Sequence, residues 1–101
     1  MNRDEAMDLI ADRIGPAAML EMLAEESAEL AHAALKMARR IRCENPTPVT
    51  MEDAESKLAE EMADVILVAK ILKIQGIQFD NNAIGAKKLK RWLDRIETMG
   101  G

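Results

Sequence analysis

The sequence predicts an all-α protein, and its composition, helix-boundary signals and helical periodicity each support this fold class. Phe and Trp occur once each and Tyr is absent, whereas β-strands draw on aromatic and β-branched residues. The chain is instead rich in Ala, Leu, Met, Glu and Lys, which favour helices. Its 101 residues suit one domain, which we assign to residues 1–101.

The first two helices are expected in the N-terminal half. Asn2 and Glu5 form a capping-box pattern for a short helix that ends near Gly15. Pro16 suits the first turn of a second helix, which runs to about Cys43. Helical spacing predicts one apolar stripe on it: Leu20, Leu23, Ser27, Leu30, Ala31, Ala34, Ala38 and Ile41.

A third helix follows a proline-containing loop. The prolines within residues 44–48 disfavour helix there, and Thr50 is a suitable N-cap for a helix that ends at Gly76. Residues 65–72 of this helix are apolar almost all round, which predicts burial on more than one side. One small chain cannot cover such a helix, so we expect a homodimer or a homotetramer.

The fourth helix is expected to run to about Thr98. Asp80, Asn81 or Asn82 can cap its N-terminus. Apolar residues at helical spacing predict its inner face: Ile84, Leu89, Trp92, Leu93 and Ile96.

Charge and composition argue against several classes of protein. A net charge of −4 disfavours general nucleic-acid binding. No apolar run approaches the roughly 20 residues of a membrane-spanning helix, and no basic-then-apolar leader opens the sequence. A single cysteine, Cys43, fits a reducing cytoplasm, and with His32 as the single histidine a zinc site has too few ligands.

One acidic pattern occurs twice, at residues 25–30 and 60–65. Both copies read Glu-Glu-x-Ala-acid-aliphatic. Residues three apart share one side of a helix, so each copy projects two carboxylates together. If the two helices pack antiparallel, these carboxylates meet, and such a cluster is unfavourable without a cation. All-oxygen ligands suit Mg²⁺, with Mn²⁺ as an alternative.

The chain resembles the MazG-like branch of the all-α nucleotide pyrophosphohydrolases over residues 20–96. The resemblance rests on both acidic patterns, the Asn-Pro-Thr-Pro loop and the basic Lys-Leu-Lys-Arg-Trp segment. It implies a four-helix MazG-like bundle whose two long helices pack in a dimer or a dimer of dimers. The implied reaction is magnesium-dependent hydrolysis of a (deoxy)nucleoside triphosphate to monophosphate and pyrophosphate, for nucleotide-pool housekeeping.

The resemblance also implies residue roles. The metal ligands would be Glu26, Glu29, Glu61 and Asp64, with Glu25 and Glu60 as auxiliary acids. Either Glu25 or Glu26 would accept the proton of the attacking water. The residues expected to hold phosphate charge are Lys36, Lys88 and Arg91.

Two other interpretations remain open. Phosphoribosyl-ATP pyrophosphatase shares the acidic motifs, although the basic segment and the proline loop favour the first assignment. A non-catalytic helical interaction module that keeps the fold is the alternative from another class. Acids on helices are usually solvated, so either acidic pattern alone would indicate only surface. Two copies with matching flanks favour a site.

Overall fold

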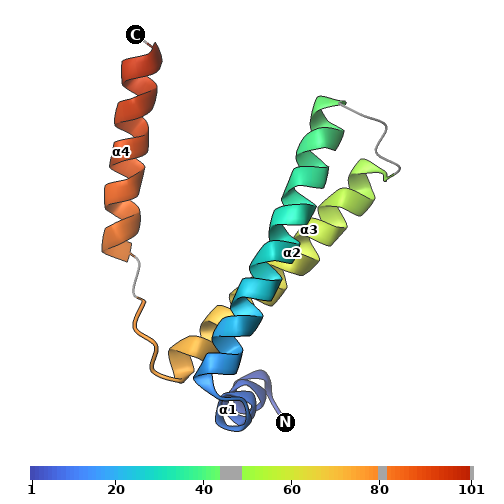
Figure 1. Cartoon of the computed structure of the whole chain (residues 1–101), viewed down its shortest axis with the longest axis vertical. Helices are drawn as coiled ribbons and strands as arrows, with labels where there is room; N and C mark the ends of the chain where they lie inside the picture. The colour runs from blue at the N-terminus through green and yellow to red at the C-terminus, as the bar shows by residue number, and fades with distance from the viewer. Residues whose placement is uncertain (44–48, 80–81, 101) are drawn as a thin grey trace.

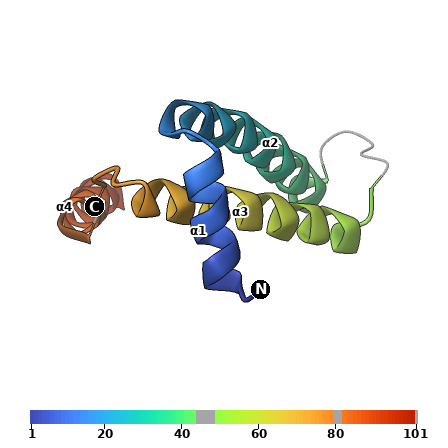
Figure 2. The same ribbon diagram turned by 90° about the horizontal axis from the view of Figure 1, so that it is seen from below.

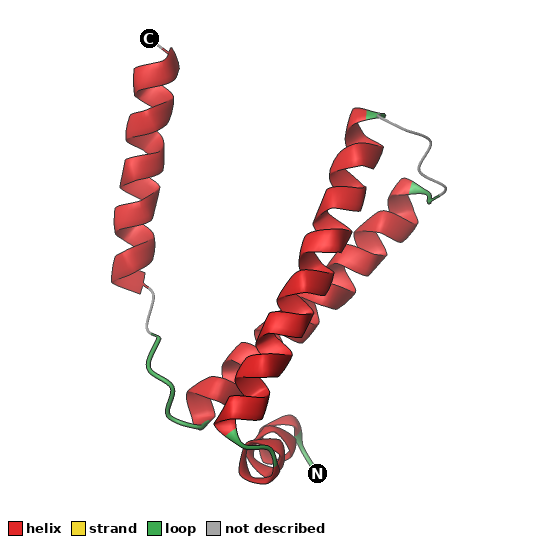
Figure 3. Ribbon diagram, viewed as in Figure 1, coloured by secondary structure: helices red, strands yellow, loops and turns green. Residues whose placement is uncertain are grey.

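Two long antiparallel helices, α2 (Pro16–Arg42) and α3 (Met51–Ile74), form the centre of the molecule (Figure 1). The computed structural model describes residues 1–43, 49–79 and 82–100. Within these ranges the secondary structure is entirely helical (Figure 3). Helix α1 (Arg3–Arg13) crosses one end of the central pair, and α4 (Asn82–Gly100) stands apart from it (Figure 2). The predicted all-α fold with four helices is confirmed.

The helix boundaries follow the capping residues. The Asn2 side chain accepts a hydrogen bond from the Glu5 backbone N–H at 2.8 Å, and Thr50 Oγ1 accepts one from the Asp53 N–H at 3.0 Å. At the end of α3, Gly76 adopts a φ of 91°, which favours glycine. The predicted loop at 44–48 and the candidate caps at 80–81 lie outside the described residues.

Helices α2 and α3 meet along a seam whose residues recur at alternating spacings of three and four, as between paired helices. All of its members are buried or half-buried. On α2 they are Met19, Leu23, Glu26, Leu30, Ala33, Met37 and Arg40. On α3 they are Ala54, Leu58, Glu61, Val65, Val68, Leu72 and Gln75. Two acids, Glu26 and Glu61, therefore occupy positions where apolar side chains are usual.

The predicted apolar stripe of α2 is only partly correct. Leu23, Leu30 and Ala38 are half-buried, but five of the other predicted positions are exposed: Leu20, Ser27, Ala31, Ala34 and Ile41. The predicted stripe follows mainly apolar residues, whereas the seam includes Glu26 and leaves these five residues outside.

The apolar core lies where α1 meets the central pair. Met19, Val68, Ile71 and Leu72 are buried there, and α1 packs its half-buried apolar side chains against them. Gln75 fixes the end of α1, because its Nε2 donates to the backbone oxygens of Ala11 at 3.1 Å and Ile14 at 2.6 Å. These carbonyls would otherwise lack helical partners.

Helix α4 stands apart from the other helices (Figure 1), and the described residues of the chain leave its apolar side chains exposed. The residues predicted to form its inner face are all exposed: Ile84, Leu89, Trp92, Leu93 and Ile96. The radius of gyration is 17.6 Å, against about 13 Å for a closed domain of this length. Ile66 and Ile74 on α3 are also exposed. Among the described helices, none is long and apolar enough to cross a bilayer.

Candidate metal centre

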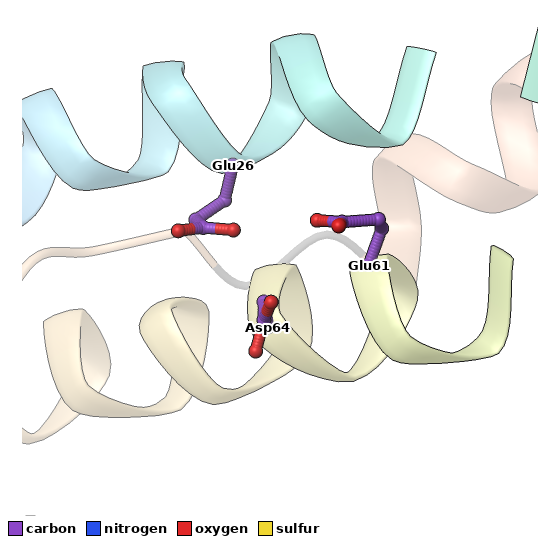
Figure 4. Close-up of side chains that lie close together, drawn as sticks. All are labelled: Glu26, Glu61 and Asp64. Atoms are coloured by element: carbon purple, nitrogen blue, oxygen red, sulfur yellow. The ribbon is translucent and has the colours of Figure 1, made fainter. Parts of the chain in front are cut away.

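Three acidic side chains from the two central helices converge at the seam (Figure 4). Glu26 comes from α2, and Glu61 and Asp64 come from α3. One carboxylate oxygen of each lies within 4.8 Å of the others. We call these residues the acidic cluster. The antiparallel pairing brings three of the four predicted metal ligands together.

Glu61 is the member most withdrawn from water, with its side chain 4% exposed. Its Oε2 is buried and has no hydrogen-bond partner. A buried carboxylate oxygen without a donor is unfavourable unless a cation or proton neutralises it. The donor set is all oxygen, which is the set that Mg²⁺ and Mn²⁺ prefer. The residues present therefore fit a hard divalent cation.

The cluster also changes the pKa of Glu26. Desolvation raises this pKa above its ordinary value, and the negative charges of Asp64, Glu61 and Glu29 raise it further. A hydrogen bond with the Asp64 carboxyl acts in the same direction. Crowded carboxylates that favour a proton will also favour another positive charge in its place.

This shift predicts a pH dependence in metal-free protein. Folded Glu26 holds its proton more tightly than the unfolded chain does, since its pKa is raised from 4.5. The unfolding free energy should therefore fall as pH rises through the window above 4.5, and stay lower above the folded pKa. Glu26→Gln cannot titrate, so it should gain stability relative to wild type as pH rises above 4.5.

Urea unfolding in chelator measures this difference. Glu21→Gln, an exposed change on the same helix, is the control and should follow wild type. Parallel pH profiles for wild type and Glu26→Gln would contradict the raised pKa.

A polar groove of about 450 Å³ adjoins the cluster. Its lining residues are Glu25, Ala28, Glu29, His32, Ala33 and Lys36 of α2, and Lys57 of α3. Glu25 and Glu29 are exposed. Glu29 lies beside the acidic cluster, close enough for its charge to raise the Glu26 pKa. The groove combines two ammonium groups with carboxylates, as expected where anions and cations bind together.

An apolar pocket of about 260 Å³ lies on the other side of the cluster. Glu26 and Asp64 form one part of its wall. The rest is apolar and comes from three helices: Ile10, Ile14, Met19, Met22, Leu67, Val68 and Ile71. The acidic cluster thus separates an apolar pocket from a polar groove along the central helix pair.

The family model of the MazG nucleotide pyrophosphohydrolase domain matches residues 14–91. The chain belongs to this family. The matched segment contains both central helices and the whole acidic cluster. Members of the MazG family are pyrophosphohydrolases, so the family match supports an enzyme of this general class. Among curated proteins and solved structures, none matches the chain significantly.

The remaining predicted site residues lie at different places relative to the acidic cluster. Lys36 lines the polar groove. Glu60 is 66% exposed on the side chain and lies 4.0 Å from the Lys57 ammonium. Lys88 and Arg91 line a hollow with Trp92 and Arg95 on α4 alone, so one chain does not bring them to the cluster.

Lys57 was not among the predicted site residues, although it contacts the acidic cluster. Its Nζ lies 2.7 Å from Glu61 Oε1, and a hydrogen bond to Glu61 raises the Lys57 pKa above its ordinary value. The signal was present, because residues four apart on a helix face each other.

Proposed function

We propose that the protein hydrolyses nucleoside triphosphates to monophosphates and pyrophosphate with Mg²⁺ as its cofactor. The observation that carries the proposal is the buried, partnerless Glu61 oxygen within a cluster of three carboxylates. An acidic cluster of this kind favours a cation, and a cation beside a groove with two ammonium groups favours a polyphosphate.

We assign cation binding and proton transfer to different acidic residues of the chain. Glu26, Glu61 and Asp64 would hold the cation, with Glu29 completing the set from the groove side. A bound divalent cation supplies charge neutralisation for phosphate oxygens and makes water more acidic. Glu25 is exposed on the groove, and we assign to its carboxylate the proton of the attacking water. Glu60 would be an auxiliary acid, which adds negative charge near the cation.

The two hollows suggest how a nucleotide lies. Lys36 would contact the phosphates in the polar groove. The apolar pocket offers a nucleobase a mainly aliphatic wall, with carboxylates only on the side shared with the cluster. Such a pocket selects mainly by shape, so we propose that standard and altered bases are both candidate substrates, in keeping with nucleotide-pool housekeeping in the cytoplasm.

A panel of nucleotides with Mg²⁺, assayed separately for pyrophosphate and orthophosphate, tests this function. We expect pyrophosphate from at least one standard, deaminated or oxidised nucleoside triphosphate. Orthophosphate alone would place the cut at the β–γ bond and refute the proposal. No product from the whole panel would instead favour the non-catalytic module, and cleavage of phosphoribosyl-ATP alone would favour that pyrophosphatase.

We also propose that the working unit is a homodimer or homotetramer. Trp92 is 65% exposed and Leu89 is 68% exposed on α4, and a contiguous apolar surface of this kind usually marks an interface. A second copy would cover it. Lys88 and Arg91 would then reach phosphate only across the interface between copies.

Light scattering at micromolar concentration should accordingly report at least twice 11.2 kDa. Trp92→Glu should shift the protein toward the monomer, because a charge would be buried in the interface. Lys87→Gln changes the net charge by the same amount outside the predicted inner face and should keep the wild-type mass. A monomeric wild type would contradict the assembly.

A further inference from the structure

Lys57 brings a positive charge into contact with the acidic cluster. Its ammonium lies 2.7 Å from Glu61 Oε1, although the Lys57 side chain is 53% exposed and the Glu61 side chain only 4%. The buried acid is therefore neutralised by a group that reaches it from the solvent side. The second Glu61 oxygen has no such partner.

The ammonium and a divalent cation would compete for the same carboxylate. Both are attracted to Glu61, and like charges a few ångströms apart repel each other. A cation that binds both Glu61 oxygens would therefore displace the Lys57 ammonium from Oε1. Lysine suits such movement, because its charge sits on a flexible four-carbon stem.

The Lys57 side chain can move from Glu61 into the polar groove. Lys57 already lines it, opposite Lys36 and His32 of α2. This is the groove in which the proposed function places the polyphosphate. An ammonium released from Glu61 would therefore face phosphate oxygens, which are a favourable partner for it.

We propose that Lys57 is an internal counter-ion that holds Glu61 in the metal-free protein and gives it up when Mg²⁺ binds. The freed ammonium then binds the polyphosphate in the polar groove. Cation loading and substrate binding are coupled in this way through one side chain. The inference rests on the metal site of the proposed function, and it makes Lys57 a positioning residue before it becomes a substrate contact.

Titration calorimetry and thermal shift with Mg²⁺ alone, and again with Mn²⁺, test the first step. Lys57→Met keeps the length of the side chain and removes the competing charge. Its half-saturating Mg²⁺ concentration should be about three- to five-fold lower than that of wild type, as expected for the loss of one ion pair. Lys57→Arg keeps a cation and should need at least as much Mg²⁺ as wild type.

Lys73→Met is the matched control for net charge. It removes the same charge from the same helix, sixteen residues or about 24 Å further along, and should leave the half-saturating concentration unchanged. Circular dichroism should give all variants the helical content of wild type. An unchanged or higher Mg²⁺ requirement in Lys57→Met would overturn the proposal.

The second step is tested with an α,β-methylene nucleoside triphosphate, which cannot be cleaved at that bond, at saturating Mg²⁺. Lys57→Met should bind this analogue about three- to five-fold more weakly than wild type, even though it binds Mg²⁺ more tightly. Equal binding would remove the phosphate role. If wild type itself shows no response to Mg²⁺ or Mn²⁺, the metal site fails together with this inference. A normal wild-type response with an unaltered Lys57→Met refutes the Lys57 role alone.

Discussion

Asp64→Asn is expected to release pyrophosphate roughly 100-fold more slowly than wild type or slower, since it would remove a charged ligand from the cation of the proposed reaction. Its carboxylate lies in the acidic cluster, with an oxygen within 4.8 Å of those of Glu26 and Glu61. Asn is similar in size, so α3 should keep its packing and the helical content should not change. Turnover under saturating Mg²⁺ and nucleotide measures the effect.

Two further variants are compared with Asp64→Asn: Glu29→Gln, a second change at the site, and Glu55→Gln, a control. Glu29 is exposed on the polar groove beside the cluster, and we expect its loss to reduce turnover nearly as much. Glu55 is an exposed acid on α3 outside the cluster. Exposed substitutions usually shift stability by less than about 0.5 kcal/mol, so Glu55→Gln should retain wild-type activity. Near-normal turnover of Asp64→Asn would show that the cluster is not the site.

The second large effect concerns metal and stability. Mg²⁺ at 100 times its dissociation constant should stabilise the folded protein by about 2.7 kcal/mol. For a chain of this size, that corresponds to a rise in Tm of about 13 °C. Chelator should remove the rise. Glu61→Gln should lose most of it, because the most buried ligand of the cluster can no longer carry charge.

Differential scanning calorimetry with and without millimolar Mg²⁺ measures both proteins. Glu55→Gln again serves as the control and should rise in Tm as wild type does. Equal melting of wild type in Mg²⁺ and in chelator would count directly against a metal site. An undiminished rise in Glu61→Gln would move the site away from the seam.

The helices were predictable because their signals are local. Asn2, Pro16 and Thr50 act within a few residues of the helix starts that they mark, so their effect does not depend on the rest of the fold. The acidic cluster was predictable for another reason. Two acids three positions apart share a helix side, and an antiparallel pairing then brings the two pairs together.

The predictions that were wrong concerned which side of each helix packs against a neighbouring helix. Leu20 and Ile41 are as apolar as Leu23, yet they are exposed while Leu23 is half-buried. The seam follows a register that passes through Glu26, which no search for apolar periodicity would choose. Helix α4 shows the same limit, because its predicted inner face is exposed and packs against none of the residues that the structure describes.

The position of two acids in the seam has a consequence for engineering. Leu at position 26 or 61 would fit the spacing of paired helices and would remove buried charges that repel each other. Such variants should tolerate heat better in the absence of metal and should have no activity. A screen for heat resistance in the presence of chelator would therefore favour variants that have lost the acids at positions 26 and 61, and with them the proposed activity. Stability and activity oppose each other in the same way in other proteins whose active sites are locally unstable. Selection for heat resistance in this protein needs Mg²⁺ in the medium from the start.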